Sequence, residues 1–210
     1  MAHLIEWYFE QGLPLVGRYD MPLIRRQAVA LDDLQLIRYS NTVTDDVQGA
    51  AASVHFYEDD GKFDEVWSAP EGHLAELAAY RQVLSPDFSL WMDTSAMLQL
   101  VNTFRNRWCG AYWQAQGMTV IPTVSWSGGK SFDFCFAGIE IGSVVSVSTV
   151  GCRDVPWEFM RGYGEMFRAI RPSIVVCYGE PFDEMWDFGK VVVVPYARDQ
   201  RIVARLPEDG

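Results

Sequence analysis

Seven short apolar runs recur along the chain, and they limit the possible folds more than any other feature of the sequence. Most of them are rich in β-branched residues and lack strict polar–apolar alternation, which is typical of strands covered on both faces. Successive runs mostly begin roughly 25 to 36 residues apart. This spacing leaves room for a helix and its two connections. The runs lie at residues 34–39, 52–57, 82–86, 118–126, 142–150, 173–179 and 190–196.

The segments between the runs have the features of helices. The longest is predicted to be capped by Asp93 or Thr94 and to stop at Gly117. Its apolar residues recur with a period near 3.6, so we expect them to form the buried face. These residues are Met97, Leu100, Val101, Phe104, Trp108, Ala111, Tyr112 and Ala115.

Three further helices are expected. One begins at Pro156, after the potential cap Asp154, and ends at Arg171. Another starts at Pro70, and a short one covers residues 182–188. In the helix that begins at Pro156, the residues expected to face inward are Trp157, Met160, Tyr163, Met166, Phe167 and Ile170.

Strands and helices that alternate at this spacing predict right-handed βαβ units and a mostly parallel sheet. The fold class is therefore α/β, and the sheet is built from successive βα units. An incomplete, TIM-barrel-like assembly is favoured because side chains that follow several strands are then expected to converge. The alternative is an open, doubly wound sheet in three layers. No glycine-rich nucleotide fingerprint follows any run, which argues against a Rossmann domain.

The whole chain of 210 residues is expected to form one domain. Residues 1–50 are the least regular part, and residues 41–50 read as an exposed polar loop. Residues 197–210 form a polar tail, in which the apolar residues of RIVARL allow a last edge strand.

Charge and composition restrict the partners. The net charge is −11, from 17 basic and 28 acidic residues, which disfavours general binding to nucleic acid. The first ten residues contain Glu6 and Glu10 where a signal peptide needs apolar residues, and no apolar run is long enough to span a membrane. The four cysteines form no C-x-x-C pair, so we expect a cytoplasmic protein with reduced thiols. Its partner is expected to be a small molecule or another protein, and its oligomeric state is left open.

Candidate catalytic groups follow the predicted strands, because functional side chains gather at the carboxyl ends of strands in either arrangement. Asp59, Asp87 and Glu180 are the candidate catalytic residues, since two differently tuned carboxyl groups can share the roles of acid and base. Trp126 offers an aromatic wall for a sugar or base ring. Paired carboxylates beside such a wall are the components of a glycoside-hydrolysing site.

Candidate binding residues lie nearby, and each also has a purely structural interpretation. They are Arg105, Asn106, Trp126, Lys130 and Tyr178. Lys130 belongs to a Gly-Gly-Lys-Ser segment that either wraps a phosphate or forms an ordinary loop. Arg105 is expected to be half-buried, where it either orients an anion or is held by a carboxylate such as Asp87. Arg107 is expected to be solvated.

The carboxylates have structural alternatives of the same kind. Asp93 and Asp154 stand where helix caps are wanted, and capping is the favoured interpretation for both. Asp59 belongs to an Asp-Asp-Gly turn sequence. No residue is assigned as a metal ligand, although a divalent cation at the acidic strand ends is left open.

Several stretches resemble an uncharacterised family, domain of unknown function 4417. They are HFYEDD (55–60), SPDFS (85–89), RNRW (105–108), GAYWQ (110–114), SFDFCFAGI (131–139), SVSTVG (146–151) and YG (178–179). The resemblance covers residues 50–180. It implies a phage or mobile-element context and brings no catalytic residues with it.

Three functions remain open at this point. The first is a carboxylate-based hydrolase of a sugar-, nucleoside- or nucleotide-like small molecule. The second is a non-catalytic interaction or decoy protein that binds a host or phage protein. The third is metal-dependent processing of nucleic acid, with a metal held by Asp59, Asp60 and Asp87, and it requires a basic groove that the sequence does not reveal.

Overall fold

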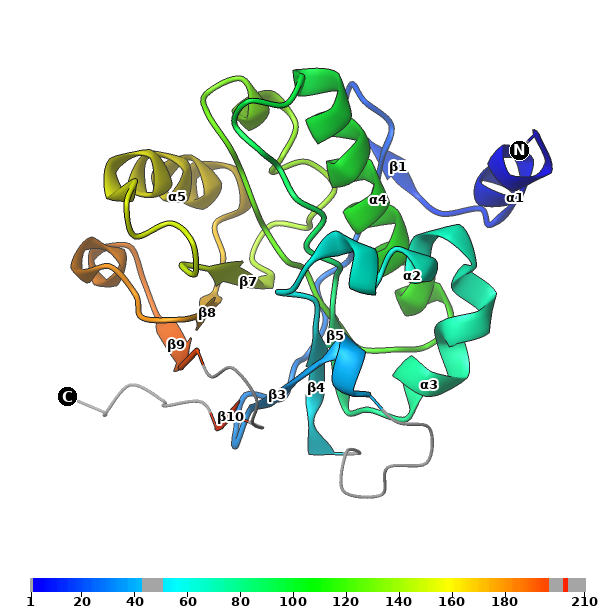
Figure 1. The fold of residues 1–210 in the computed structure, drawn as a ribbon, viewed down its shortest axis with the longest axis horizontal. Helices are drawn as coiled ribbons and strands as arrows, with labels where there is room; N and C mark the ends of the chain where they lie inside the picture. The colour runs from blue at the N-terminus through cyan, green and yellow to red at the C-terminus, as the bar shows by residue number, and fades with distance from the viewer. Residues whose placement is uncertain (1, 43–50, 197–201, 204–210) are drawn as a thin grey trace.

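A computed structural model of the chain describes residues 2–42, 51–196 and 202–203 (Figure 1). Seven strands of the described chain lie within or against the runs expected from the sequence. They are β3 (Gln35–Arg38), β4 (Ser53–His55), β5 (Gln82–Leu84), β6 (Val120–Ile121), β7 (Val144–Ser148), β8 (Ile174–Tyr178) and β9 (Val191–Val194). A small antiparallel pair, β1 (Leu15–Val16) and β2 (Met21–Pro22), precedes them.

Consecutive strands are neighbours in the sheet. Strands β3 to β6 pair in parallel in that order, and β7 to β9 do the same. A parallel bridge between Thr123 and Ser146 joins the two sets just beyond β6. A doubly wound sheet requires the strand order to reverse at one point, and no such reversal occurs here. The α/β fold of successive βα units is thus confirmed, and the doubly wound alternative is not what forms.

The sheet curls instead of lying flat. Tyr57 follows β4 and Tyr178 ends β8, and their rings stack with centroids 4.9 Å apart. In a flat sheet these strands, four positions apart, would be separated by about 19 Å. The buried residues that gather on the inner side of the curl come from β3, β5, β6, β8 and β9. They are Leu34, Leu36, Leu84, Ile121, Val176, Tyr178, Val192 and Val194.

The curled sheet does not close into a barrel within the described residues. At the open edge a short strand, β10 (Ile202–Val203), pairs with β3 in antiparallel orientation. This is the edge strand that the apolar residues of the tail allow. The predictions for residues 43–50 and for most of the tail concern residues outside the described part of the chain.

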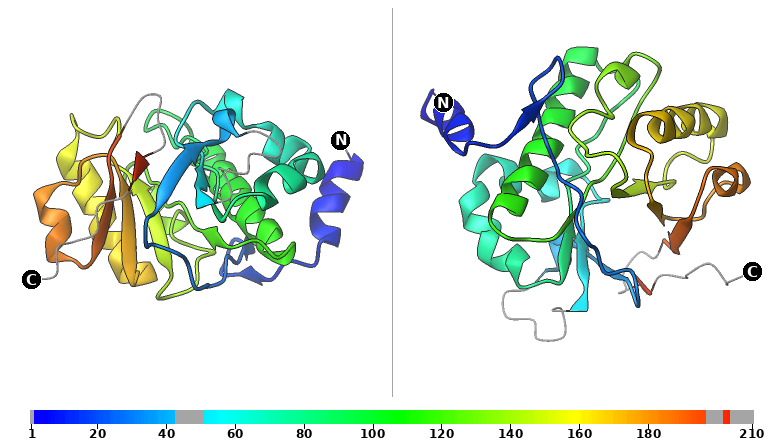
Figure 2. Two further views of the ribbon diagram at one scale, coloured as in Figure 1. Left: turned by 90° about the horizontal axis from the view of Figure 1, so that it is seen from below. Right: turned by 180° about the vertical axis from the view of Figure 1, so that it is seen from behind.

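Helices cover the outer side of the sheet. Helix α4 (Ala96–Ala115) packs on β6 and β2, and α2 (Glu65–Ser68) packs on α4. Helix α3 (Leu74–Ala78) packs on β5, while α5 (Pro156–Ile170) packs on the 3₁₀ turn η6 (Asp183–Asp187). Helix α1 (Ala2–Glu10) lies at the opposite end of the molecule from α5, with α4 between them (Figures 1 and 2).

The predicted buried face of α4 is partly wrong. Met97 and Val101 are 67% and 45% exposed, whereas Gln99, Thr103 and Arg107 are buried. The reason is that α4 packs against loop segments and strand ends whose backbone carbonyls are free to accept hydrogen bonds. Polar side chains satisfy those carbonyls and turn the first apolar residues outward. The cap is also corrected, since Ser95 and neither of the two predicted residues caps this helix.

Helix α5 begins at Pro156 and ends at Arg171, which adopts a left-handed conformation with φ of 49°, as the boundaries predicted. Two details differ. Trp157 is 76% exposed and does not face inward. The residue before the helix is Val155, and no side chain caps its first turn, so Asp154 is not the cap. Among the described residues, no helix is long and apolar enough to cross a membrane.

Candidate functional site

A pocket of about 390 Å³ lies at the carboxyl ends of β4, β5, β6 and β7. Its volume is in the range of small-molecule sites. The segments that follow these four strands supply its walls, together with the first turn of α5. The lining residues are Tyr57, Glu58, Asp87, Ser89, Leu90, Trp91, Met92, Val124, Ser125, Trp126, Ser127, Ser148, Val150, Gly151, Cys152, Val155, Glu158 and Phe159.

Asp87 follows β5 and is partly buried in this pocket. Burial raises the pKa of its carboxyl group to about 6, and the negative charge of Asp60 adds to the rise. A hydrogen bond from Ser125 Oγ to Asp87 Oδ1, at 2.8 Å, and the charge of Arg107 lower the pKa in part. Asp87 therefore changes its protonation state near neutral pH, as a general acid or base must.

Glu58 is a second carboxylate of the pocket, and it stands three residues after the end of β4. Its side chain is 3% exposed. Oε1 accepts a hydrogen bond from the backbone N–H of Ser40 at 2.9 Å. Oε2 lies 3.8 Å from Lys62 Nζ and has no hydrogen-bond partner. The sequence analysis selected its neighbour Asp59 and missed Glu58. The available signal was its position immediately after the apolar run.

Two tryptophans form aromatic walls. Trp126 lies 5.0 Å from the ring of Phe159, centroid to centroid, and passes over Gly162 of α5. A Cβ atom at Gly162 would lie 2.1 Å from Trp126 Nε1, so only glycine leaves room for the indole. Trp91 stands at the mouth of the pocket and is 67% exposed.

Two side chains of α4, Arg107 and Asn106, donate hydrogen bonds to backbone carbonyls in the segments that follow the strands. Arg107 is 2% exposed, which corrects the expectation that it is solvated. Its guanidinium donates to the carbonyl oxygens of Ala137, Thr123 and Cys135 at 2.9, 3.1 and 2.6 Å. Burial lowers the pKa of Arg107 to about 10, while the charge of Asp87 raises it. The buried arginine that acts on Asp87 is thus Arg107 and not Arg105.

Asn106 is buried and links two strand ends. Its Nδ2 donates to the Pro86 carbonyl at 2.6 Å and to the Thr123 carbonyl at 3.3 Å. Its Oδ1 accepts from Ser85 Oγ at 2.9 Å. Asn106 does not line the pocket. It holds β5 and β6 in register at the point where Asp87 and Ser125 begin their loops.

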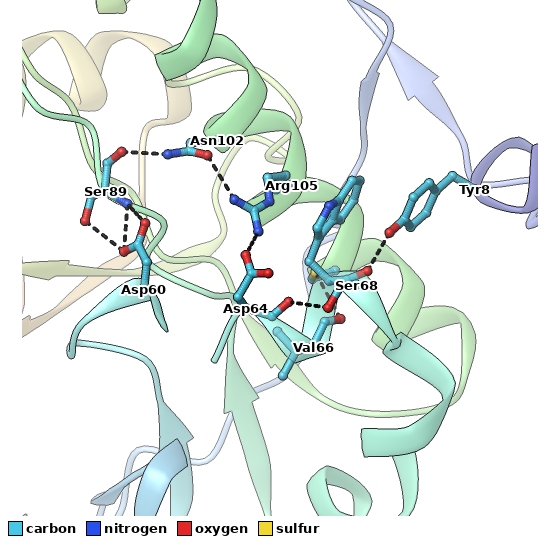
Figure 3. Close-up of polar contacts among 10 residues, drawn as sticks. Tyr8, Asp60, Asp64, Val66, Ser68, Ser89, Asn102 and Arg105 are labelled. Atoms are coloured by element: carbon cyan, nitrogen blue, oxygen red, sulfur yellow. Dashed lines mark hydrogen bonds and ion pairs between the residues drawn. The ribbon is translucent and has the colours of Figure 1, made fainter. Parts of the chain in front are cut away.

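Arg105 belongs to a second hydrogen-bond network, on the outer side of the loop that follows β5 (Figure 3). It forms an ion pair with Asp64, and its guanidinium lies 3.9 Å above the ring of Phe88. It also donates to Asn102 Oδ1 at 3.3 Å. Its carboxylate partner is Asp64, and the expected pairing with Asp87 does not form.

The network continues toward the pocket through Ser89. Asn102 Nδ2 donates to the Ser89 carbonyl at 2.8 Å (Figure 3). The carboxylate of Asp60 accepts from the backbone N–H of Ser89 at 3.2 Å and from its hydroxyl at 2.8 Å. Asp60 therefore fastens the segment after Asp87 and has a structural task.

The remaining predicted residues lie outside the pocket lining. Asp59, Glu180 and Lys130 are exposed. Only the backbone carbonyl of Glu180 makes a described hydrogen bond, from Thr149 Oγ1 at 2.8 Å and from Arg153. Tyr178 is completely buried, and its ring stacks on Tyr57. Of the predicted site residues, the structure brings Asp87 and Trp126 into the pocket.

The pocket contains one thiol, Cys152, which is half-buried. Burial and the charge of Asp87 raise its pKa, so it is a poor nucleophile at neutral pH. The other three cysteines are buried. Within the described ranges, no three His, Cys, Asp or Glu side chains lie close enough together to hold a metal ion.

Comparison with known protein families assigns the chain to one of them. The family model described as Domain of unknown function (DUF4417) matches residues 13–196. The chain belongs to this family. The match confirms the resemblance and extends it beyond residues 50–180 on both sides. All residues that line the pocket lie within the matched range.

Two relatives are phage proteins, which confirms the phage context. The chain is 43% identical over 131 residues to the Gene 1 protein of Mycobacterium phage L5, covering 61% of this chain and 57% of that protein. It is 41% identical over 133 residues to the Gene 1 protein of Mycobacterium phage D29, covering 62% and 49%. The chain thus spans about half the length of these relatives. No solved structure matches the chain significantly.

Proposed function

We propose that the pocket hydrolyses a glycosidic or N-glycosidic bond in a sugar- or nucleoside-like small molecule. The observation that carries the proposal is the state of Asp87, a carboxyl group inside a pocket with its pKa raised to about 6. A second carboxylate, Glu58, and the aromatic wall Trp126 line the same pocket. Two carboxyl groups in different environments beside an aromatic ring are the components that such a reaction requires.

In this proposal Asp87, protonated, gives its proton to the leaving oxygen or nitrogen atom as the bond to the sugar carbon breaks. Glu58 takes a proton from the water molecule that attacks that carbon. One water molecule is consumed, and both carboxyl groups return to their first state by proton exchange with solvent. Trp126 stacks on the ring, and the Ser125 hydroxyl holds the Asp87 carboxyl group in place. Negative charge at both carboxyl positions stabilises the positive charge that develops on the sugar ring.

The experiment is a hydrolysis screen with aryl glycosides and nucleosides, followed by single substitutions. Asp87→Asn and Glu58→Gln are each expected to reduce kcat by about 10² to 10⁴. The matched control is Asp59→Asn, which removes an exposed carboxylate next to Glu58 but outside the lining. Thermal unfolding of all three variants is measured in parallel. Equal activity of Asp87→Asn and the wild type would contradict the proposal.

A second candidate, an interaction protein, is favoured by one observation. Five large apolar side chains before and within the first turns of α4 are 45% to 67% exposed, and exposed apolar side chains that gather in one segment are typical of an interaction surface. They are Trp91, Met92, Met97, Leu98 and Val101. In a test of biological activity, an interaction role predicts that Met97→Ser with Leu98→Ser abolishes the activity while Asp87→Asn leaves it intact. The hydrolase predicts the reverse.

Metal-dependent processing of nucleic acid gains no support from the site. Asp60 is engaged with Ser89, and Asp59 is exposed outside the lining. The three aspartates proposed for the metal therefore do not converge among the described residues.

A further inference from the structure

We infer that the pocket rejects anionic ligands and takes an uncharged, hydroxyl-bearing ring, a sugar or a nucleoside and not its phosphorylated counterpart. The inference deepens the proposed function and rests on it for the choice of sugar or nucleoside. The charge preference itself rests on which side chains line the pocket and on where the neighbouring cations point.

The lining carries negative charge and contains no cation of its own. Its ionisable carboxyl groups are Glu58, Asp87 and Glu158, and no Lys, Arg or His is among its described residues. A phosphate group entering this space would lose its water and meet like charges, and such an arrangement is strongly unfavourable. Sites that bind phosphate instead supply Arg, Lys or a row of backbone N–H groups.

The nearby cations are committed elsewhere. The guanidinium of Arg107 donates to three backbone carbonyls and to Asn106 beneath the pocket. Arg153 donates to the Glu180 carbonyl and lies over the ring of Phe182 at 4.6 Å.

Arg105 pairs with Asp64 on the far side of the loop after β5. Lys62 Nζ lies 3.8 Å from Glu58 Oε2, and the charge of Arg38 also interacts with Glu58. Neither residue lines the pocket, so both offset part of one charge without offering a ligand a cationic partner.

The N-terminus of α5 favours anions, but a carboxylate of the protein already occupies that position. The first turn of α5 lies against the pocket, and the N-terminus of a helix attracts negative charge. Glu158 occupies that turn and lines the pocket, so its carboxylate already interacts with the helix dipole. An incoming phosphate would have to displace this charge.

Glu58 adds negative charge to the wall of the pocket. Its side chain is nearly buried, Oε2 is shielded from solvent, and Lys62 Nζ lies 3.8 Å from it. An ionised phosphate offers only acceptors to a wall of carboxyl groups, whereas a sugar hydroxyl also offers a donor.

The charge preference is tested with Cys152, because this thiol lines the pocket and the other three are buried. Iodoacetamide and iodoacetate have nearly the same size, and they differ in that one is neutral and the other anionic. Their alkylation rates at Cys152 are measured by peptide mass spectrometry, and their ratio is divided by the ratio for glutathione under the same conditions. This quotient cancels the fraction of thiolate and reports the electrostatic potential in the pocket.

The neutral reagent is expected to be favoured at Cys152 by about threefold or more over the ratio for the free thiol. Asp87→Asn and Glu58→Gln are each expected to bring the quotient closer to one, while the exposed control Asp59→Asn leaves it unchanged. A quotient below about two, or no reaction with either reagent, would overturn the inference. The assay needs no hydrolysis, so an inactive protein with a high quotient would refute the proposed function alone.

Discussion

Asp87 combines a partly buried carboxyl group with a hydrogen bond that does not fully compensate its burial. Ser125 donates to it, yet its pKa remains raised to about 6. A carboxylate kept only to hold a helix or a strand is normally stabilised in its charged form, which lowers the pKa. Its environment therefore points to a chemical role more than to a structural one.

This environment predicts how the stability of the Asp87→Asn variant depends on pH. Because the pKa of Asp87 is higher in the folded chain than the ordinary value of about 3.9 in the unfolded chain, its ionisation destabilises the fold as pH rises from about 4 through 6. Asparagine keeps an acceptor for Ser125 and removes the charge. We expect Asp87→Asn to be more stable than the wild type at pH 8, by at most about 3 kcal/mol.

The measurement is urea unfolding of both proteins at pH 4 and at pH 8. At pH 4 the stabilities are expected to converge, because the wild-type carboxyl group is then mostly protonated in the folded chain. A variant that is less stable than the wild type at pH 8 would show that Asp87 supports the fold.

Position relative to an apolar run was an incomplete guide to the site residues. Asp87 follows the run 82–86 and Trp126 ends the run 118–126, and both line the pocket, whereas Glu180 follows the run 173–179 and is exposed outside it. Arg105 and Arg107 stand on the same helix, and the sequence does not show which one meets free carbonyls. Those carbonyls belong to Thr123, Cys135 and Ala137, which are brought to the helix only by the folded chain.

At the scale of elements, strands were easier to predict than helix faces. The β-branched runs near β7, β8 and β9 have one physical explanation, burial on both faces, and all three strands form there. The buried face of α4 follows a different rule, because its polar side chains reach backbone carbonyls of the segments packed against the helix. Gln99, for example, donates to the carbonyls of Trp91 and Thr94 at 2.8 and 3.0 Å. Hydrophobic periodicity does not contain that information.

Helix α5 offers a matched pair of glycines for testing how it positions the aromatic wall. Gly162→Ala would place a Cβ atom 2.1 Å from Trp126 Nε1, whereas at Gly164 the nearest atom, Phe188 Cε1, would be 3.6 Å away. We expect Gly162→Ala to destabilise the fold by about 1 to 3 kcal/mol and to change the fluorescence of Trp126. Gly164→Ala is expected to be neutral or stabilising by up to about 1 kcal/mol, since alanine favours the helix.

Both variants are compared by thermal unfolding and by tryptophan emission in the folded state. If Gly162→Ala and Gly164→Ala behaved alike, the close contact between α5 and Trp126 would be absent in solution.

At the scale of the molecule, the curl of the sheet makes the pocket. It brings segments after four neighbouring strands to one place, where Glu58, Asp87, Trp126 and Cys152 meet. Sequence spacing predicted the parallel order of the strands, but the extent of the curl depends on packing between distant strands such as β4 and β8. For this reason the sequence analysis identified the correct edge of the sheet, but several residues that it selected, such as Asp59 and Glu180, lie outside the pocket lining.

The most direct test is a carbon-13 NMR titration of the Asp87 carboxyl group, assigned by comparison with Asp87→Asn. Its pKa depends on burial by segments after several strands and on Ser125, Asp60 and Arg107. If the strand ends assemble into the pocket described above, Asp87 titrates near pH 6. A midpoint near pH 4, the ordinary value for an exposed aspartate, would contradict both the pocket and the role proposed for Asp87.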